Sequence, residues 1–198
     1  MRPRQRLVQL TATLAAVILL GAACGSDSTQ DATAPSADSP TAGTTADEGS
    51  FTVVTYQGAD LLGGSEITFD SLLGQGTPIV LNYWAAQCPP CLVEMPWFQA
   101  AYEQHADSVL LIGLDVGQFT GLGTTEQGAE LLADLDITYP AGYAVDDEPL
   151  RRFSVTNMPF TVFFDEAGEV VGNHAGLMTE QQIQDWFANL ATGAGSRP

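Results

Sequence analysis

Residues 78–91 decide the fold: Pro78-Ile79-Val80-Leu81-Asn82-Tyr83-Trp84-Ala85-Ala86-Gln87-Cys88-Pro89-Pro90-Cys91. The segment from Ile79 to Trp84 is apolar and mostly β-favouring, which is typical of a strand that is buried on both faces of a sheet. A Cys-x-x-Cys pair follows, and after it the apolar residues recur at helical spacing. The pattern therefore predicts a buried strand that leads into a pair of cysteines at the start of a helix.

The positions of these two cysteines favour redox chemistry. Cys88 would cap the helix, where unpaired backbone N–H groups and the helix dipole favour its thiolate, the nucleophilic form. Pro89 and Pro90 suit a first turn because their missing N–H groups would have no partner there. We expect Cys88 to be exposed and Cys91 to point inward. A disulfide between residues three apart closes a very small ring and tends to be reducible.

Two other uses of a Cys-x-x-Cys pair are disfavoured. A zinc site needs about four ligands, often from a second such pair or a His-x-His pair, and the sequence has neither. Covalent haem attachment needs His directly after the second Cys, where Leu92 stands. We therefore expect no metal and no cofactor.

The motif Trp84-Ala85-Ala86-x-Cys88-Pro89-Pro90-Cys91, followed by Glu94-x-Pro96, resembles the thioredoxin-like family, specifically its TlpA/ResA/DsbE branch of exported thiol–disulfide oxidoreductases. The resemblance covers residues 51–192. It implies an α/β fold with a mixed central sheet flanked by helices and with an N-terminal β-hairpin extension. It also implies that the Cys88 thiolate attacks a substrate disulfide and that Cys91 resolves the mixed disulfide. A membrane thiol reductant would then reduce the Cys88–Cys91 disulfide again.

The same resemblance gives roles to five residues around the cysteines. Met158-Pro159 matches the family's cis-proline, which lies beside the active-site cysteine and docks an extended substrate. Trp84 would shield the motif, although a purely structural role in the core would explain it equally well. The implied substrate-binding residues are Met158, Trp84, Pro89 and Pro90.

Glu94 is the predicted proton relay. It lies three residues after Cys91 and hence on the same helical face, and it matches an acidic residue of the branch that tunes the cysteines and handles their protons. Asn82 stands where thioredoxin itself has a buried Asp, which makes Glu94 the better candidate. The alternative is an ordinary solvated helix carboxylate.

Residues 1–24 are typical of a secretory signal, with three arginines in the first six residues and an apolar run too short for a comfortable membrane span. Small residues before Cys24 resemble a bacterial lipobox, which implies cleavage there and lipid attachment to Cys24. Gly21 departs from the pattern, which usually has Leu. The alternatives are ordinary export with Cys24 lost or free, or an uncleaved anchor. In each case we expect an exported domain, and lipid on Cys24 would hold it at the extracytoplasmic face of the membrane. We expect it to act on disulfide-containing exported proteins, with cytochrome c maturation as one client class by resemblance.

Composition bounds the remaining possibilities. Residues 25–50 contain almost only small and polar residues and predict a disordered tether, and residues 193–198 predict a disordered tail. The chain has 6 Arg, no Lys and 24 acidic residues, giving a formal charge of −18. This charge argues against nucleic acid as a partner, because that binding needs cations to neutralise phosphates.

The rest of the domain alternates between strands and helices. Strands are expected at 51–56, 66–69, 109–116 and 137–145, a loop at 119–125, a hairpin at 155–172, and helices at 125–135 and 180–190, the last capped by Thr179. This alternation predicts a mainly parallel sheet. His105 and His174 receive no catalytic role.

Two rival functions share this fold. A redoxin-type thiol peroxidase usually holds its reactive cysteine in a Thr-x-x-Cys segment, but Ala85 stands three before Cys88. A copper-binding assembly lipoprotein would use the two thiolates and a His such as His174, but that pattern spaces its cysteines by three residues rather than two. Both rank below the oxidoreductase.

Overall fold

The computed structural model describes residues 49–193, so Cys24, the signal, most of the predicted tether and the tail lie outside the described residues. Seven strands form one sheet in the order β2-β1-β5-β4-β3-β6-β7. The strands are β1 (Thr52–Gln57), β2 (Glu66–Thr68), β3 (Ile79–Trp84), β4 (Leu110–Asp115), β5 (Ala141–Ala144), β6 (Phe160–Phe164) and β7 (Val170–Ala175). The helices are α1 (Ala59–Leu62), the 3-10 turn η1 (Phe69–Leu72), α2 (Pro89–His105), α3 (Gly117–Thr120), α4 (Thr125–Asp134), α5 (Glu148–Arg152) and α6 (Glu180–Ala191).

The sheet is mixed, as the family resemblance implies. Strand β3 pairs in parallel with β4, and β4 pairs in parallel with β5. The remaining neighbours, β1 with β2, β1 with β5, β3 with β6 and β6 with β7, are antiparallel. The expectation of a mainly parallel sheet is therefore wrong. Hairpins at both ends of the domain add antiparallel strands to a short parallel centre.

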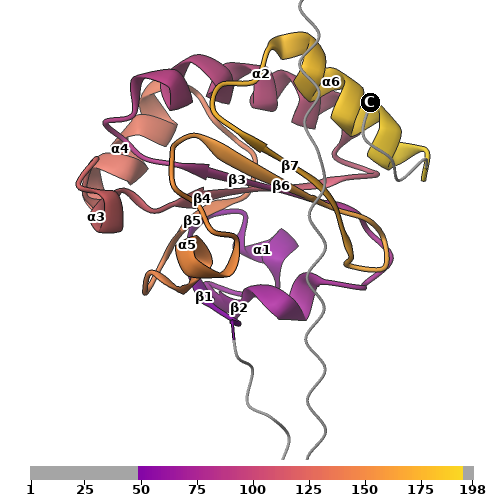
Figure 1. The fold of residues 1–198 in the computed structure, drawn as a ribbon, viewed down its shortest axis with the longest axis horizontal. Coiled ribbons are helices and arrows are strands. Elements are labelled where there is room, and N and C mark those ends of the chain that lie inside the picture. The colour runs from indigo at the N-terminus through magenta and orange to yellow at the C-terminus, as the bar shows by residue number, and fades with distance from the viewer. Residues whose placement is uncertain (1–48, 194–198) are drawn as a thin grey trace, which may run out of the picture. The chain divides into compact units, whose positions relative to one another are not determined.

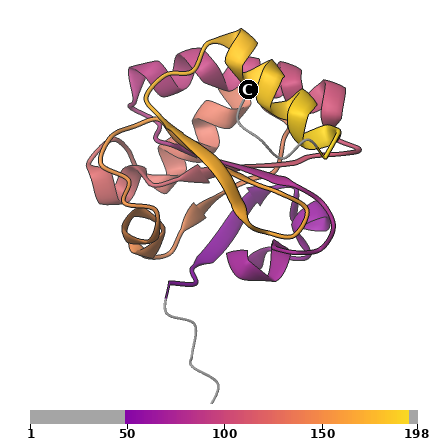
Figure 2. The same cartoon turned by 45° about the vertical axis from the view of Figure 1, so that its right-hand side comes forward.

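Strand β3 lies inside the sheet between β4 and β6, and every one of its side chains is buried. Ile79 and Leu81 face one side of the sheet, whereas Val80 and Trp84 face the other. Helices α2, α4 and α6 pack on the Val80 side, and α1, η1 and α5 pack on the Ile79 side. Figures 1 and 2 show α2 and α6 side by side over one face of the sheet. Both faces of β3 are thus covered, as its continuous apolar run predicts.

The N-terminal β-hairpin extension is confirmed, since β1 and β2 are antiparallel neighbours with Val53 opposite Ile67. The turn between them contains the short helix α1, which we did not predict. Gly58 begins this helix with a φ of 79°, and a Cβ there would lie 2.8 Å from the Cα of Pro140. Only glycine fits that backbone conformation and that space.

Helix α2 begins at Pro89, as the predicted cap at Cys88 and first turn at Pro89 and Pro90 require, and it continues through Pro96. Two other element boundaries differ from expectation. Part of the predicted loop at 119–125 belongs to the short helix α3. Only the β5 residues of the predicted strand 137–145 form a strand. The final helix starts as predicted, with the side chain of Thr179 accepting a hydrogen bond from the backbone N–H of Gln182.

Candidate active site

Strand β3 delivers the two cysteines to the start of α2. Cys88 occupies the N-cap in an extended conformation, and Pro89 and Pro90 fill the first turn, as the sequence predicts. Cys88 and Cys91 form a disulfide with their Cα atoms 5.3 Å apart. The expectation that Cys88 is exposed is wrong, because its relative exposure is 2% and that of Cys91 is 0%. Cys88 is buried by the segments that pack around the turn, and a local sequence motif does not predict that packing.

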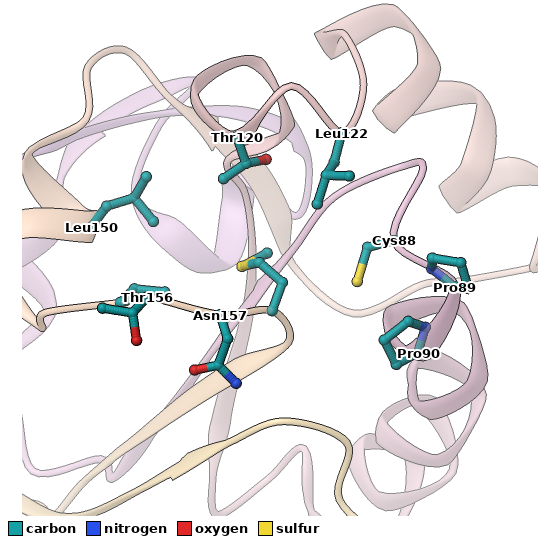
Figure 3. A pocket seen from close by; sticks show the side chains of 10 residues that line it. Cys88, Pro89, Pro90, Thr120, Leu122, Leu150, Thr156 and Asn157 are labelled. Carbon is teal, nitrogen blue, oxygen red and sulfur yellow. The ribbon is translucent and has the colours of Figure 1, made fainter.

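Cys88 reaches solvent through a pocket of about 370 Å³. In Figure 3, Cys88, Pro89 and Pro90 lie on one side of the pocket, and Leu150 and Thr156 lie on the other. The full lining is Cys88, Pro89, Pro90, Thr120, Leu122, Leu150, Val155, Thr156, Asn157 and Met158. Three of the four predicted substrate-binding residues are therefore in the pocket. The fourth, Trp84, is fully buried in the core cluster that contains both cysteines and is not part of the lining.

The Met158–Pro159 peptide bond is cis, as the resemblance implies. Pro159 is buried directly before β6, and its carbonyl oxygen accepts a hydrogen bond of 2.8 Å from the N–H of Gly176. Met158 is half-buried and lines the pocket together with Cys88. The loop that carries the cis bond is thus a wall of the same pocket, while the docking role of Pro159 stays a prediction.

Glu94 is completely buried, so the alternative of a solvated helix carboxylate is wrong. One carboxylate oxygen accepts a hydrogen bond of 2.9 Å from the amide of Asn82, and the other accepts one of 3.1 Å from the backbone N–H of Met178. The Asn82 amide also donates to the hydroxyl of Thr161 at 3.0 Å. Burial raises the pKa of Glu94 to about 7, and the two hydrogen bonds only partly oppose this. The side chain can therefore gain or lose a proton near neutral pH.

Further polar groups lie buried around Glu94 without a hydrogen-bond partner. They are Oδ1 of Asn82, Nε1 of Trp84 and the hydroxyl of Tyr139. Burial, and then the negative charge of Glu94, raise the pKa of Tyr139. Asn82 and Trp84 both lie on β3, and Tyr139 approaches them across Gly113 of the neighbouring strand, where an added Cβ would lie 2.9 Å from Tyr139 and 3.0 Å from Nε1 of Trp84. Sequence reasoning missed Tyr139, because nothing local distinguishes it from an ordinary core tyrosine.

Asp115 is a second buried carboxylate that the sequence did not reveal. It ends β4 beside Trp84, and its two oxygens accept hydrogen bonds from the N–H of Gly117 at 2.8 Å and from the hydroxyl of Tyr56 at 2.9 Å. Burial raises its pKa, although both hydrogen bonds lower it. The Gly117 contact fixes the start of α3, and the segment after it supplies Thr120 and Leu122 to the pocket. Asp115 therefore positions one wall of the site.

The rival functions gain no structural support from these surroundings. Among residues 49–193, no three His, Cys, Asp or Glu side chains gather closely enough to hold a metal ion. Ala85 is fully buried, with its backbone oxygen accepting a hydrogen bond from the N–H of Cys88.

No helix within the described part of the chain is long and apolar enough to span a bilayer.

Known proteins resemble this chain in sequence and in fold. A model of the AhpC/TSA family matches residues 50–181. The sporulation thiol-disulfide oxidoreductase A of Bacillus subtilis is 27% identical over 69% of this chain and 76% of its own length. The thiol-disulfide oxidoreductase ResA of Oceanobacillus iheyensis is 26% identical over 64% of this chain and 63% of its own length. The fold is similar to that of the exposed lipoprotein thioredoxin of Streptococcus pneumoniae, with a TM-score of 0.59 and 19% identity over 71% of this chain and 99% of that one.

Proposed function

The chain belongs to the AhpC/TSA family and is a thioredoxin-like oxidoreductase, and from this premise we propose that it is an exported, membrane-tethered enzyme that reduces protein disulfides through Cys88 and Cys91. The observation that carries the proposal is the Cys88–Cys91 disulfide at a helix N-terminus, opening onto a pocket that the cis-proline loop also lines. The names of both relatives support the reaction type.

The reaction transfers two electrons from the reduced enzyme to a client disulfide. The Cys88 thiolate attacks one sulfur of the client, a mixed disulfide forms, and the other client sulfur leaves as a thiolate. Cys91 then gives up its proton and attacks the sulfur of Cys88, which releases the second client thiol and closes the Cys88–Cys91 disulfide. A separate thiol reductant returns the two electrons.

Glu94 would accept the proton that Cys91 loses. The two residues lie three apart on α2, and therefore on the same helical face, and both are fully buried. A general base works best when its pKa lies near the working pH, and burial raises the pKa of Glu94 to about 7. Asn82 and Met178 hold the carboxylate by its two oxygens and keep it oriented.

The charges around the cysteines support the proposed direction, in which electrons pass from this protein to its client. Strong oxidants such as DsbA owe their potential to a stabilised reduced form. Here no Lys or Arg lies between or beside Cys88 and Cys91 in the sequence, and Glu94 follows on the same helix. A redox titration against glutathione should give a potential near that of thioredoxin, about −270 mV, whereas a value near that of DsbA, about −120 mV, would make the protein an oxidant.

Membrane tethering is proposed through lipid on Cys24. The lipobox-like segment before Cys24 supports it. Cys24→Ala should release the protein from the membrane fraction or block its processing. Mature Cys24→Ala protein that stays fully membrane-bound would contradict the anchor while leaving the redox function untouched.

Two variants test the redox roles directly. Cys88→Ser should abolish reduction of insulin disulfides, whereas Cys91→Ser should stall as a mixed disulfide with its client, which mass spectrometry can identify. Retained activity in Cys88→Ser, together with its loss in Cys91→Ser and no adduct, would reverse the assignment.

A further inference from the structure

We propose that the pocket beside Cys88 selects clients that carry an uncharged, apolar side chain next to the attacked cysteine, and that it rejects anionic disulfides such as oxidised glutathione. This inference rests on the proposed disulfide exchange at Cys88 and names the substrate class of that site.

The pocket lining is apolar or uncharged throughout. Leu122, Leu150, Val155 and Met158 contribute aliphatic or thioether surface, and Thr120, Thr156 and Asn157 contribute neutral polar groups. A volume of about 370 Å³ is at the small end for ligand sites and suits one or two side chains of a client. Figure 3 shows Leu122 beside Cys88 and Leu150 across the opening. A side chain flanking the client cysteine can therefore enter between these leucines.

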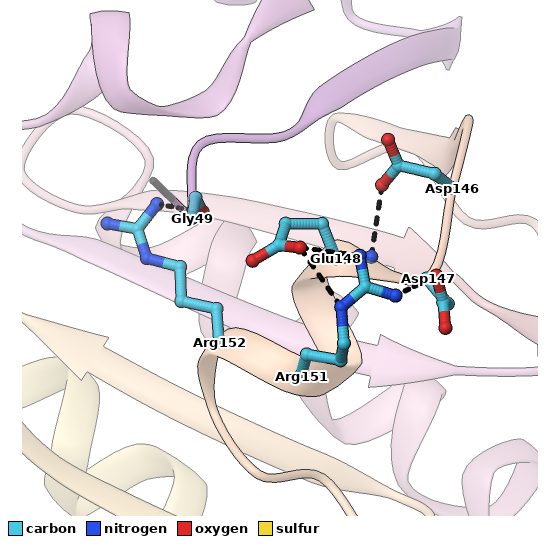
Figure 4. A network of polar contacts seen from close by, with 6 residues as sticks. All are labelled: Gly49, Asp146, Asp147, Glu148, Arg151 and Arg152. Carbon is cyan, nitrogen blue, oxygen red and sulfur yellow. Dashed lines mark hydrogen bonds and ion pairs between the residues drawn. The ribbon is translucent and has the colours of Figure 1, made fainter. Parts of the chain in front are cut away.

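The described part of the chain offers no free cation for a carboxylate. The sequence has no Lys, and Arg151 and Arg152 are the two arginines within residues 49–193. Arg151 forms ion pairs with Asp147 and Glu148, and Arg152 forms an ion pair with Asp70. Figure 4 shows the Arg151 cluster and the hydrogen bond from Arg152 to the carbonyl of Gly49. His105 packs against Phe187, and neither it nor His174 lines the pocket.

The charged residues on either side of Leu150 in the chain are acidic on balance. Asp146, Asp147 and Glu148 precede Leu150, and Arg151 and Arg152 follow it, so three acidic residues face two basic ones. An anionic client group would lose water without gaining a charged partner and would meet this negative segment. An apolar client side chain would instead gain the free energy of burial. The two effects act in the same direction.

The test uses capped Gly-X-Cys-Gly peptides joined as homodimeric disulfides, in which X is Leu, Ala or Asp. The measured quantity is the second-order rate constant for oxidation of the reduced enzyme, obtained by acid quench, alkylation and mass spectrometry. Burial of a leucine side chain predicts at least about tenfold faster reaction for X = Leu than for X = Asp, with X = Ala between them. Oxidised glutathione should react no faster than the Asp peptide.

Thr156→Arg supplies the missing cation at an exposed position on the pocket rim. We expect it to accelerate the Asp peptide and oxidised glutathione several-fold and to leave the Leu peptide slower or unchanged. Thr77→Arg is the matched control, because it adds the same charge to an exposed threonine before β3, about 20 Å from the cysteine end of that strand. Raised salt should weaken the Thr156→Arg gain, since it screens exposed charges.

The outcomes separate this proposal from the function on which it rests. Equal rates for the Leu, Ala and Asp peptides would overturn the selectivity while leaving disulfide exchange in place. Acceleration of the Asp peptide by both arginine variants alike would overturn the pocket as its cause. Failure of the reduced wild-type enzyme to react with any peptide, matching Cys88→Ser, would overturn the proposed function and this proposal with it.

Discussion

Glu94 and Asp70 lie on opposite faces of the same sheet, and their surroundings differ in kind. Asp70 is the second residue of η1. It accepts two hydrogen bonds from the guanidinium of Arg152, at 2.7 and 2.8 Å, and one from the hydroxyl of Ser50. Glu94 lies deeper, and its carboxylate meets only neutral N–H donors from Asn82 and Met178. Both are carboxylates in a protein with few cations, but only Asp70 has a cationic hydrogen-bond partner.

The two pKa values move in opposite directions as a result. Burial raises the pKa of Glu94 to about 7 because neutral donors do not replace the lost water. Burial alone would also raise the pKa of Asp70, but the hydrogen bonds from Arg152 and Ser50 lower it below 3.8. Asp70, which is paired with a cation, therefore stabilises the fold. Glu94, which lies near the dithiol and has no cationic partner, can exchange a proton.

The largest expected effect comes from placing a second acid beside Glu94. Asn82→Asp removes the amide donor and puts two carboxylates in contact in a buried site, where they cannot both ionise. We expect a loss of about 4 kcal/mol of unfolding free energy at pH 8 relative to wild type, shrinking towards pH 5, by urea denaturation at each pH.

The double variant Asn82→Asp/Glu94→Gln is the control for that prediction. The new amide at position 94 can donate to the new carboxylate, so most of the lost stability should return at pH 8. Equal destabilisation of Asn82→Asp at both pH values would mean that packing, not charge, causes the loss.

Glu94→Gln should remove a pH dependence of about 3 kcal/mol. The folded pKa of about 7 exceeds the ordinary value of 4.5, so the native state binds more protons between these values. Wild-type stability therefore falls as the pH rises from about 4.5 to 7, while the variant should lack this decline. Thermal or urea unfolding from pH 5 to 8 measures it.

Glu130→Gln is the matched control, since it removes the same charge from an exposed position on α4. Its stability profile should follow that of wild type. A Glu94→Gln profile that falls between pH 5 and 7 as steeply as wild type would contradict the raised pKa.

Arg152→Ala should cost about 2 kcal/mol of stability without changing the potential of the Cys88–Cys91 couple. It removes the Asp70 pair and the contact of the guanidinium with the ring of Phe153, whose centroid lies 5.1 Å away. The estimate is below that for a fully buried pair because both side chains remain partly in water. Urea denaturation at pH 7 measures the loss.

The pH dependence of this variant checks the cause. Because the folded pKa of Asp70 lies below 3.8, its contribution is present above that pH and is lost as the pH falls further. The acid-induced loss should therefore be smaller in Arg152→Ala. Arg151→Ala, which breaks only exposed pairs, should be nearly neutral. A comparable loss in both arginine variants would contradict the special role of the Asp70 pair.

The sequence predicted those features whose causes are local. The apolar run of β3, the helix that follows it, and the cysteines between them all depend on neighbouring residues, and the structure has each of them. The cis bond before Pro159 and the N-terminal hairpin followed from the family resemblance. The roles of Glu94 in proton transfer and of Cys24 in lipidation stay predictions.

The features that sequence reasoning missed depend on distant contacts. Glu94 is held by the N–H of Met178, which is 84 residues away, and Asp115 by Tyr56, which is 59 residues away. The pocket takes Leu122 and Leu150 from the segments around two short helices that have no strong local signal. Cys88 is buried for the same reason, because its burial depends on packing that spacing alone does not encode.

The most direct test is a pH titration of the oxidised protein by carboxyl ¹³C NMR, following Glu94 and Asp70 in one sample. We expect Glu94 to titrate with a pKa of about 7 and Asp70 with a pKa below 3.8. A Glu94 midpoint near its ordinary value of 4.5 would contradict the claim that the acid beside the dithiol is poised to exchange a proton near neutral pH.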